Sequence, residues 1–248
     1  MTEDLTRSLP PAALLALAAL LALAACGEQH RPQQYYFPVA ELADGLVYAY
    51  EPAPDNASAA FPGYYWYYRS VATPDSTILA ATYYDLGGEP RQYAAERIVA
   101  DGALLRDLRL YRPTDSASAV TEARVLEPAV FSFRTPDPER VLVSAVRFRQ
   151  NDTSALYTIT RNRAYRRDTT LDVAGEKRAA QVWTVRELIE QDSAGTLALE
   201  SRGIEVYAEG IGLAYRRRIH SDGTVEAHRL ARRFPMSELE DMLGEEPD

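Results

Sequence analysis

The chain of 248 residues has few of the side chains that bind metals or act as nucleophiles, with one cysteine and three histidines. A single cysteine cannot form a disulfide bond within the chain, and the Cys and His spacings of a structural zinc site are missing. Thirteen glycines, fifteen prolines and no internal repeat argue against fibrous and low-complexity architectures. The formal charge of −9, from 27 basic and 36 acidic residues, argues against a nucleic-acid partner.

Catalytic and cofactor motifs are also missing. The sequence has no G-x-S-x-G elbow, no H-E-x-x-H, no P-loop and no dinucleotide-binding fingerprint. If residues 221–223 form the loop of a hairpin, His220 and His228 lie on one face but four residues apart along the strands. That is roughly 13 Å at about 3.3 Å per residue, which is too far to share one ion. Pairs such as Glu205 and Glu209 could serve a glycosidase, but chance alone produces such pairs among so many carboxylates. We expect no cofactor, no metal site (calcium held by carboxylates alone stays open) and no enzyme activity, with a hydrolase as the lesser alternative.

One long apolar run lies near the N-terminus. Ala12–Ala25 contains fourteen residues without a charge. As a helix it would span roughly 21 Å at about 1.5 Å per residue, short of the roughly 30 Å hydrocarbon core of a bilayer. A run of this length is typical of a secretion signal. It ends in the sequence Leu23-Ala24-Ala25-Cys26.

This ending resembles the lipobox of bacterial lipoproteins, in which an aliphatic and two small residues precede the cysteine that becomes lipidated. The resemblance implies a signal peptide over 1–25, palmitate and further acyl chains on Cys26, and a membrane anchor. Glu3 and Asp4 depart from the basic start of most signal peptides. Gly27 favours the outer membrane, facing the periplasm, with the inner membrane and the cell surface left open. The alternative is a buried core helix that carries a cysteine.

The rest of the chain divides into three parts. Residues 26–37 are polar and then aromatic, which predicts a lipid-anchored tether. Over 38–236, short alternating runs are separated by turn residues, without the long amphipathic helices of βαβ folds. Residues 237–248 predict a short helix and an acidic tail, because Ser237 and Glu240 have the spacing of a capping box.

The pattern over 38–236 predicts about a dozen antiparallel strands in a single β domain. We expect a mainly β fold, an antiparallel, strongly curved sheet or incomplete barrel with a short C-terminal helix; a β-sandwich is the alternative. The last hairpin can be predicted residue by residue. With 221–223 as a three-residue loop, Arg216 pairs with His228 and Arg218 lies opposite Glu226.

Two further resemblances support this fold. The segment Glu205–Tyr215 is similar to the polar strand, small turn and G-[IV]-G-L hairpin found late in curved-sheet lipoproteins, such as the periplasmic lipoprotein carrier and its outer-membrane receptor. The whole chain resembles uncharacterised lipoproteins of Bacteroidota, with a tyrosine-rich first half and a Y-A-x-G-[IV]-G-L hairpin, here Tyr207–Leu213. Both imply an antiparallel β fold in the cell envelope, and neither implies an activity or functional residues.

Aromatic residues are concentrated in the first half of the chain. Eleven of the sixteen tyrosines lie within 35–93, and five consecutive aromatic residues occupy 64–68, where alternate rings point to opposite faces of a strand. One interpretation is packed core with cross-strand aromatic ladders. The other is a groove for acyl chains, sugars or a protein. The candidate ligand-binding or partner-binding residues are Tyr48, Tyr50, Tyr64, Trp66, Tyr68 and Tyr83.

Arginine supplies 26 of the 27 basic residues, which we attribute to composition bias. We interpret Arg216, Arg217 and Arg218 as a solvated surface with cross-strand ion pairs, with contact to lipid phosphate or an acidic partner as the alternative. The sequence thus predicts a non-enzymatic lipoprotein, anchored in the membrane. Its β domain would bind an amphiphilic small molecule, lipid or glycan, or a partner protein. A structural assembly factor of an envelope complex is the alternative.

The anchor can be tested with Cys26→Ser. Without a thiol at this position no acyl chain can be attached, so the variant should leave the membrane fraction and appear in the soluble fraction of the envelope. Fractionation followed by immunoblotting measures this. A variant that stays with the membranes would show that Cys26 is not the anchor.

Overall fold

The computed structural model describes residues 32–55, 61–113, 118–149, 155–192 and 196–244. The predicted signal peptide, Cys26 and the acidic tail lie outside the described residues. Residues 32–248 form a compact unit of their own. None of the helices in the described ranges is long and apolar enough to cross a bilayer.

The described residues form twelve strands between a short 3-10 helix, η1 (Pro32–Tyr35), and a C-terminal helix, α2 (Met236–Gly244). The strands in chain order are β1 (Leu46–Pro52), β2 (Tyr64–Ala72), β3 (Thr77–Tyr84), β4 (Pro90–Val99), β5 (Gly102–Pro113), β6 (Ser118–Ser132), β7 (Val141–Arg149), β8 (Leu156–Val173), β9 (Glu176–Asp192), β10 (Thr196–Ala208), β11 (Gly212–His220) and β12 (Val225–Phe234).

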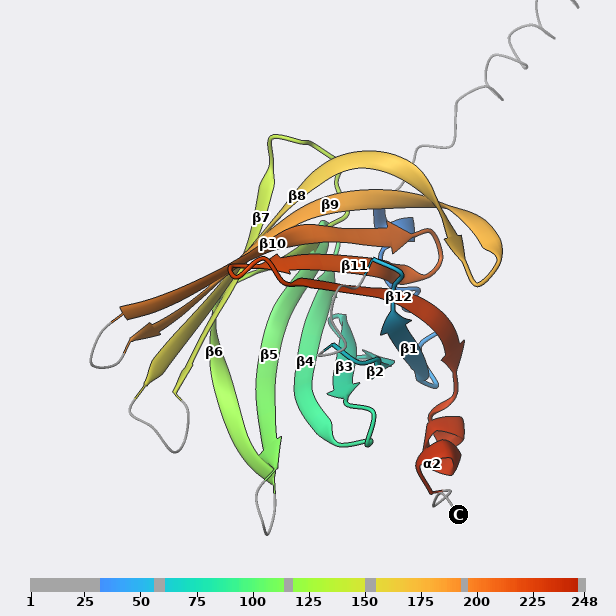
Figure 1. Ribbon diagram of the computed structural model, residues 1–248. Coiled ribbons are helices and arrows are strands. Elements are labelled where there is room, and N and C mark those ends of the chain that lie inside the picture. The colour runs from blue at the N-terminus through green and yellow to red at the C-terminus, as the bar shows by residue number, and fades with distance from the viewer. Residues whose placement is uncertain (1–31, 56–60, 114–117, 150–154, 193–195, 245–248) are drawn as a thin grey trace, which may run out of the picture. The chain divides into compact units, whose positions relative to one another are not determined.

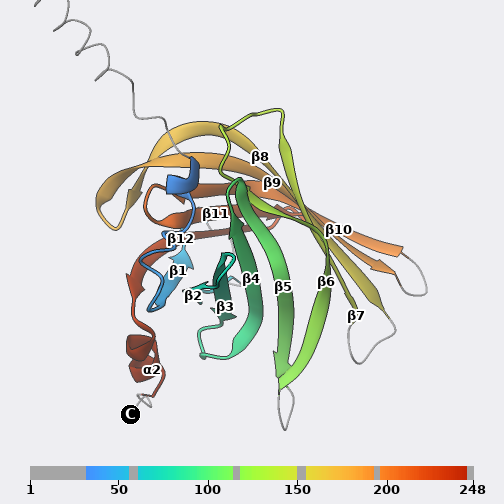
Figure 2. The ribbon, with the colours of Figure 1, turned by 180° about the vertical axis from the view of Figure 1, so that it is seen from behind.

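Each strand pairs with its neighbours in the chain, all antiparallel, and β1 pairs with β12 (Figure 1). The sheet therefore closes into a barrel, which Figure 2 shows from behind. The expected antiparallel β fold is confirmed, but a curved sheet or incomplete barrel is a correct description only in part, and the β-sandwich is wrong. Pairs such as Val47 with Phe234 join the two edges that an open sheet would leave exposed.

The last hairpin has the predicted register. Arg216 lies opposite His228 and Arg218 opposite Glu226. The turn is closed by a hydrogen bond from the His220 N–H to the Thr224 carbonyl oxygen, at 2.9 Å. Gly223 has a φ of 86°, the left-handed conformation that a three-residue hairpin loop needs.

Helix α2 packs on the outer face of β1 and β12. Leu239 is fully buried and packs with Val47 and Phe234, and Tyr65 and Tyr67 join this cluster from β2. The helix thus covers the outward rings of β2. This packing also holds the helix in place, because a helix of this length is not stable by itself in water. This leaves the other face of β2 to the barrel interior.

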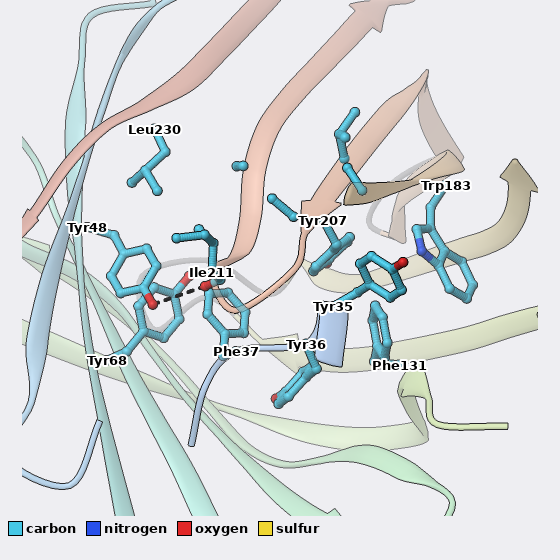
Figure 3. Close-up of a cluster of buried hydrophobic side chains, with 14 of the residues drawn as sticks. Tyr35, Tyr36, Phe37, Tyr48, Tyr68, Phe131, Trp183, Tyr207, Ile211 and Leu230 are labelled. Atoms are coloured by element: carbon cyan, nitrogen blue, oxygen red, sulfur yellow. Dashed lines mark hydrogen bonds between the residues drawn. The ribbon is translucent and has the colours of Figure 1, made fainter. Parts of the chain in front are cut away.

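Residues 35–37 lie inside the barrel. Tyr36 and Phe37, in the stretch predicted to be tether, are almost completely buried. The ring centroids of Phe37 and Tyr68 lie 4.2 Å apart, and those of Tyr36 and Phe131 lie 5.4 Å apart (Figure 3). These contacts make residues 35–37 a plug of aromatic side chains within the core.

The turn between β10 and β11 holds the plug. The Gly210 N–H donates to the Gln34 carbonyl oxygen at 2.9 Å. Gly212 has a φ of 95°, and a Cβ at this position would lie 2.5 Å from the Phe37 ring. The G-I-G-L hairpin recognised in the sequence therefore supplies the close backbone approach that the plug requires.

Gly212→Ala should consequently destabilise the barrel. Gly223→Ala is the matched control, because Gly223 also has a positive φ but no atom lies within 4 Å of its Cβ position. Both variants lose stability from left-handed strain, and Gly212→Ala should lose about 1–3 kcal/mol more from overpacking against Phe37. Urea unfolding followed by tryptophan fluorescence measures the difference. Equal losses would show that the turn does not hold the plug.

Candidate functional site

The barrel interior contains a cavity of about 360 Å³. A second cavity of about 270 Å³ shares Tyr64, Trp66, Gln92 and Arg216 with it as lining residues. Eight strands enclose an interior that side chains just fill, and a barrel of twelve strands is wider. The larger cavity lies within the range of about 300–1,000 Å³ typical of small-molecule sites.

One part of the larger cavity is apolar. Its lining there comes from β4, β5, β7 and β8 and consists of Ala94, Leu105, Leu108, Val146 and Ile159. These side chains also pack with one another as a separate hydrophobic cluster of the barrel. They offer a surface on which an acyl chain or another apolar group can be buried.

Aromatic rings from β2 and β3 form an adjoining part. Tyr64, Trp66 and Tyr68 line the larger cavity, and Tyr83 lines the smaller one. The Trp66 and Tyr68 rings stack with their centroids 5.8 Å apart, and the Tyr83 and Trp66 ring centroids lie 5.5 Å apart. Burial raises the pKa of Tyr64 to about 12, so its hydroxyl stays neutral. The structure therefore brings four of the six predicted site residues to the cavities.

The other two candidates belong to the packed core. The Tyr48 hydroxyl donates to the Ile211 carbonyl oxygen at 3.0 Å (Figure 3), and the Tyr50 hydroxyl donates to that of Leu213 at 2.7 Å. Neither ring lines either of the two cavities described above. Tyr64 and Tyr68 belong to the same buried core cluster as Tyr48 and Tyr50 and in addition line the larger cavity. That any of these rings binds a ligand stays a prediction.

Sequence reasoning missed the charged part of the interior. Four arginines and four glutamates line the two cavities: Arg161, Arg163, Arg216, Arg218, Glu96, Glu187, Glu205 and Glu226. The interpretation of 216–218 as a solvated surface is wrong for two of the three arginines. Arg217 alone faces outward, 3.3 Å from Asp55. Alternation along β11 separates these faces, but only closure of the barrel decides which face is inside.

Deep in the interior, Arg163 and Glu205 form a closed ion pair. The Arg163 Nε donates to Glu205 Oε2 at 2.8 Å, and the Tyr207 hydroxyl donates to the same oxygen at 3.1 Å. Burial by itself would raise the pKa of Glu205, but Arg163, with Arg161 and Arg216, outweighs it and lowers this pKa to about 2. Nearby, the Tyr36 hydroxyl donates to Glu96 at 2.5 Å, and burial raises the pKa of Glu96.

The remaining arginines form a second cluster around two carboxylates. Glu187 accepts from the Arg161 Nε at 2.7 Å and lies 3.3 Å from the Arg218 guanidinium. Arg216 pairs with Glu226. Burial opposes ionisation of Glu187, but Arg161 and Arg218 lower its pKa to about 2. Burial also lowers the pKa of Arg218, and its arginine neighbours add to this effect.

Two histidines flank the carboxylate of Glu226. His220 Nε2 and His228 Nδ1 lie 3.4 and 3.5 Å from Glu226, and His228 Nε2 lies 2.9 Å from the Pro62 carbonyl oxygen. Burial lowers the pKa of His228, which favours its neutral form. Within the described ranges, no group of three His, Cys, Asp or Glu could hold a metal ion. The interior thus combines fixed charges with apolar surface.

The lowered pKa values predict a loss of stability in acid. Glu187 and Glu205 titrate at about 2 in the fold, against an ordinary value of 4.5. Their contribution is therefore present above pH 4.5 and lost as the pH falls towards 2, on the order of 3 kcal/mol for each. Urea unfolding at pH 7 and pH 3 measures this. Glu187→Gln should be less stable at pH 7 and depend less on pH, and an unchanged stability of the parent protein at pH 3 would contradict the assignment.

Comparisons with known proteins identify the fold. No protein-family model and no curated protein matches the chain. A predicted lipoprotein from Parabacteroides distasonis has a similar structure, with a TM-score of 0.50 and 9% identity over 81% of this chain and 98% of that one. A predicted exported protein with a YmcC-like fold, from Bacteroides fragilis, is also similar in structure. Its TM-score is 0.52, and it is 13% identical over 80% of this chain and 98% of that one. At these identities the likeness shows the fold, a mainly antiparallel β fold shared with exported proteins of Bacteroidetes.

Proposed function

We propose that this chain is a non-enzymatic lipoprotein of the cell envelope whose barrel interior binds an amphiphilic small molecule or lipid. The observation that carries the proposal is the cavity of about 360 Å³, which is apolar on one side and charged on the other. A single ligand with an apolar tail and a polar head would match both parts of this lining.

The electrostatics around Glu187 and Glu205 support binding rather than catalysis. A general acid or base works best with a pKa near the working pH. Glu187 and Glu205 have pKa values of about 2, and the arginines facing them keep them ionised. Such groups stay charged at neutral pH, which suits recognition of a polar head.

The proposed location follows from the N-terminal sequence. The lipobox ending at Cys26 supports acylation, palmitate included, and Gly27 supports sorting to the outer membrane with the barrel facing the periplasm. The structural neighbours described as lipoprotein and exported protein agree with an envelope location. An envelope protein of this kind would meet lipids, glycans and other envelope proteins.

A second candidate is the binding of a partner protein, as in the assembly of an envelope complex. The observation in its favour is the start of β10. Its pairing with β11 begins only at Ser201, so residues 196–200 are paired on one side, with β9. Leu197 and Leu199 in this stretch are 53% and 48% exposed. A free strand edge with exposed leucines can accept a strand of another protein.

The primary proposal is tested by filling the cavity. Ala81 lies on β3 and lines the cavity, whereas the preceding Ala80 points to the opposite face of the strand. The unacylated protein, residues 27–248, should bind the neutral apolar dye N-phenylnaphthylamine with a rise in dye fluorescence. Ala81→Phe should weaken this binding by about tenfold or more, because the new ring takes the space in which the dye buries its surface.

Ala80→Phe is the matched control and should bind the dye as the parent protein does. Circular dichroism and urea unfolding verify that both variants are folded. Equal binding by the two variants would place the dye outside the barrel and would contradict the proposal. Native mass spectrometry of protein purified from a periplasm adds a direct readout, since a bound amphiphile appears as an excess mass that solvent extraction removes.

A further inference from the structure

We infer that the head of the ligand is an anion, a carboxylate or phosphate, held by Arg161, Arg216 and Arg218, with its apolar tail against Leu108 and Ile159. This inference rests on the proposed amphiphile site and names the chemical class of its ligand. It starts from the charges on the wall formed by β8, β9, β11 and β12.

Three guanidinium groups on this wall share two carboxylates. Glu187 contacts both Arg161 and Arg218, while Glu226 pairs with Arg216. Among the described residues, three guanidinium groups therefore face two carboxylates in this cluster. The remaining carboxylate of the lining outside the Arg163–Glu205 pair, Glu96, accepts from the Tyr36 hydroxyl instead, and burial raises its pKa. A buried charge is costly unless it is paired, and an incoming anion would supply the missing partner.

The hydrogen-bond donors point to the same conclusion. An arginine carries five N–H donors. The Nε of Arg216 is buried and has no acceptor among the described protein atoms. Arg218 contacts Glu187 at 3.3 Å, a long distance for a charge-assisted hydrogen bond. Donors left in this state can donate to the oxygens of a planar carboxylate or a phosphate without giving up an existing strong bond.

The deeper arginine does not offer this opportunity. Arg163 donates to Glu205 at 2.8 Å, and the side chains of this pair are only 7% and 4% exposed. The Tyr207 hydroxyl donates a hydrogen bond to the same carboxylate oxygen of Glu205. This closed pair has its charges matched, so we place the head of the ligand at Arg161, Arg216 and Arg218.

The lining also connects the two ends of such a ligand. The guanidinium of Arg216 lies over the Tyr64 ring, 5.5 Å from its centroid, and both residues line the cavity together with Trp66. Leu108 and Ile159 line the same cavity. An anionic head at the arginines would therefore leave its tail beside aromatic rings and aliphatic side chains, where burial is favourable.

The experiment compares heads on one tail. Dodecyl phosphate, dodecanoate and dodecanol, each kept below the concentration at which it aggregates, compete with N-phenylnaphthylamine for the unacylated protein, and inorganic phosphate serves as a head without a tail. Dodecyl phosphate and dodecanoate should displace the dye at concentrations about tenfold or more below dodecanol, because charge-assisted hydrogen bonds add to the burial of the same tail. Inorganic phosphate should bind far more weakly.

Arg218→Gln tests the residues. Glu187 keeps Arg161 as its partner in this variant, so no carboxylate is left unpaired. Affinity for dodecyl phosphate should fall about tenfold while affinity for dodecanol stays the same. Arg217→Gln, the neighbour that faces outward, should change neither.

The outcomes separate this inference from the proposed function. If dodecanol and dodecyl phosphate bind equally well, the anionic head is wrong and the amphiphile site stands. If inorganic phosphate binds as tightly as dodecyl phosphate, the arginines bind free phosphate and the head-and-tail inference is overturned. If neither the dye nor any of the three dodecyl compounds binds, both proposals fail. The comparison of heads needs no variant, so it stays decisive even if Arg218→Gln does not fold.

Discussion

Closure of the sheet between β1 and β12 is the constraint on which the rest of the structure depends. Once these two strands pair, alternate side chains of all twelve strands point into one shared interior. Strand side chains alone do not fill an interior of this width. The aromatic residues 35–37 fill part of it, and the cavity occupies the part they leave. The plug is itself held by the β10–β11 turn, where the Gly210 N–H donates to the Gln34 carbonyl oxygen and the absence of a side chain on Gly212 leaves room for the Phe37 ring.

The ion pairs of the interior follow from the same closure. A charge that faces inward is costly unless it is paired. Glu187, Glu205 and Glu226, on β9, β10 and β12, each contact an arginine of β8 or β11. Replacing such buried pairs by apolar residues is often neutral or stabilising in proteins. Stability alone is therefore a weak reason for so many charges beside an apolar cavity. Recognition of a polar ligand gives them a role, and this links the fold to the proposed function.

Much of the fold could be predicted from local signals. The hairpin around Gly223 was predicted in its correct register, because a glycine in a three-residue loop fixes which residues pair. The arm made by the ends of β8 and β9 was not. Alternation indicates strands only up to Tyr165 and again from Gln181, yet β8 continues to Val173. Pairing of β7 with β8 stops at Ala164, so most of this arm pairs only with itself. Beyond Tyr165, β8 contributes only Leu171 and Val173 to the core, which is too short an alternation to indicate a strand.

The sequence by itself determined which residues share a face. Alternation placed Tyr64, Trp66 and Tyr68 together, and Arg216 with Arg218, because successive side chains of a strand point to opposite sides. Only the tertiary structure decided which of those faces is the interior. An arginine whose partners are glutamates on other strands has the same local pattern as an arginine in water. The difference arises when β1 meets β12, since closure encloses one face of every strand and leaves the other to solvent and helix α2.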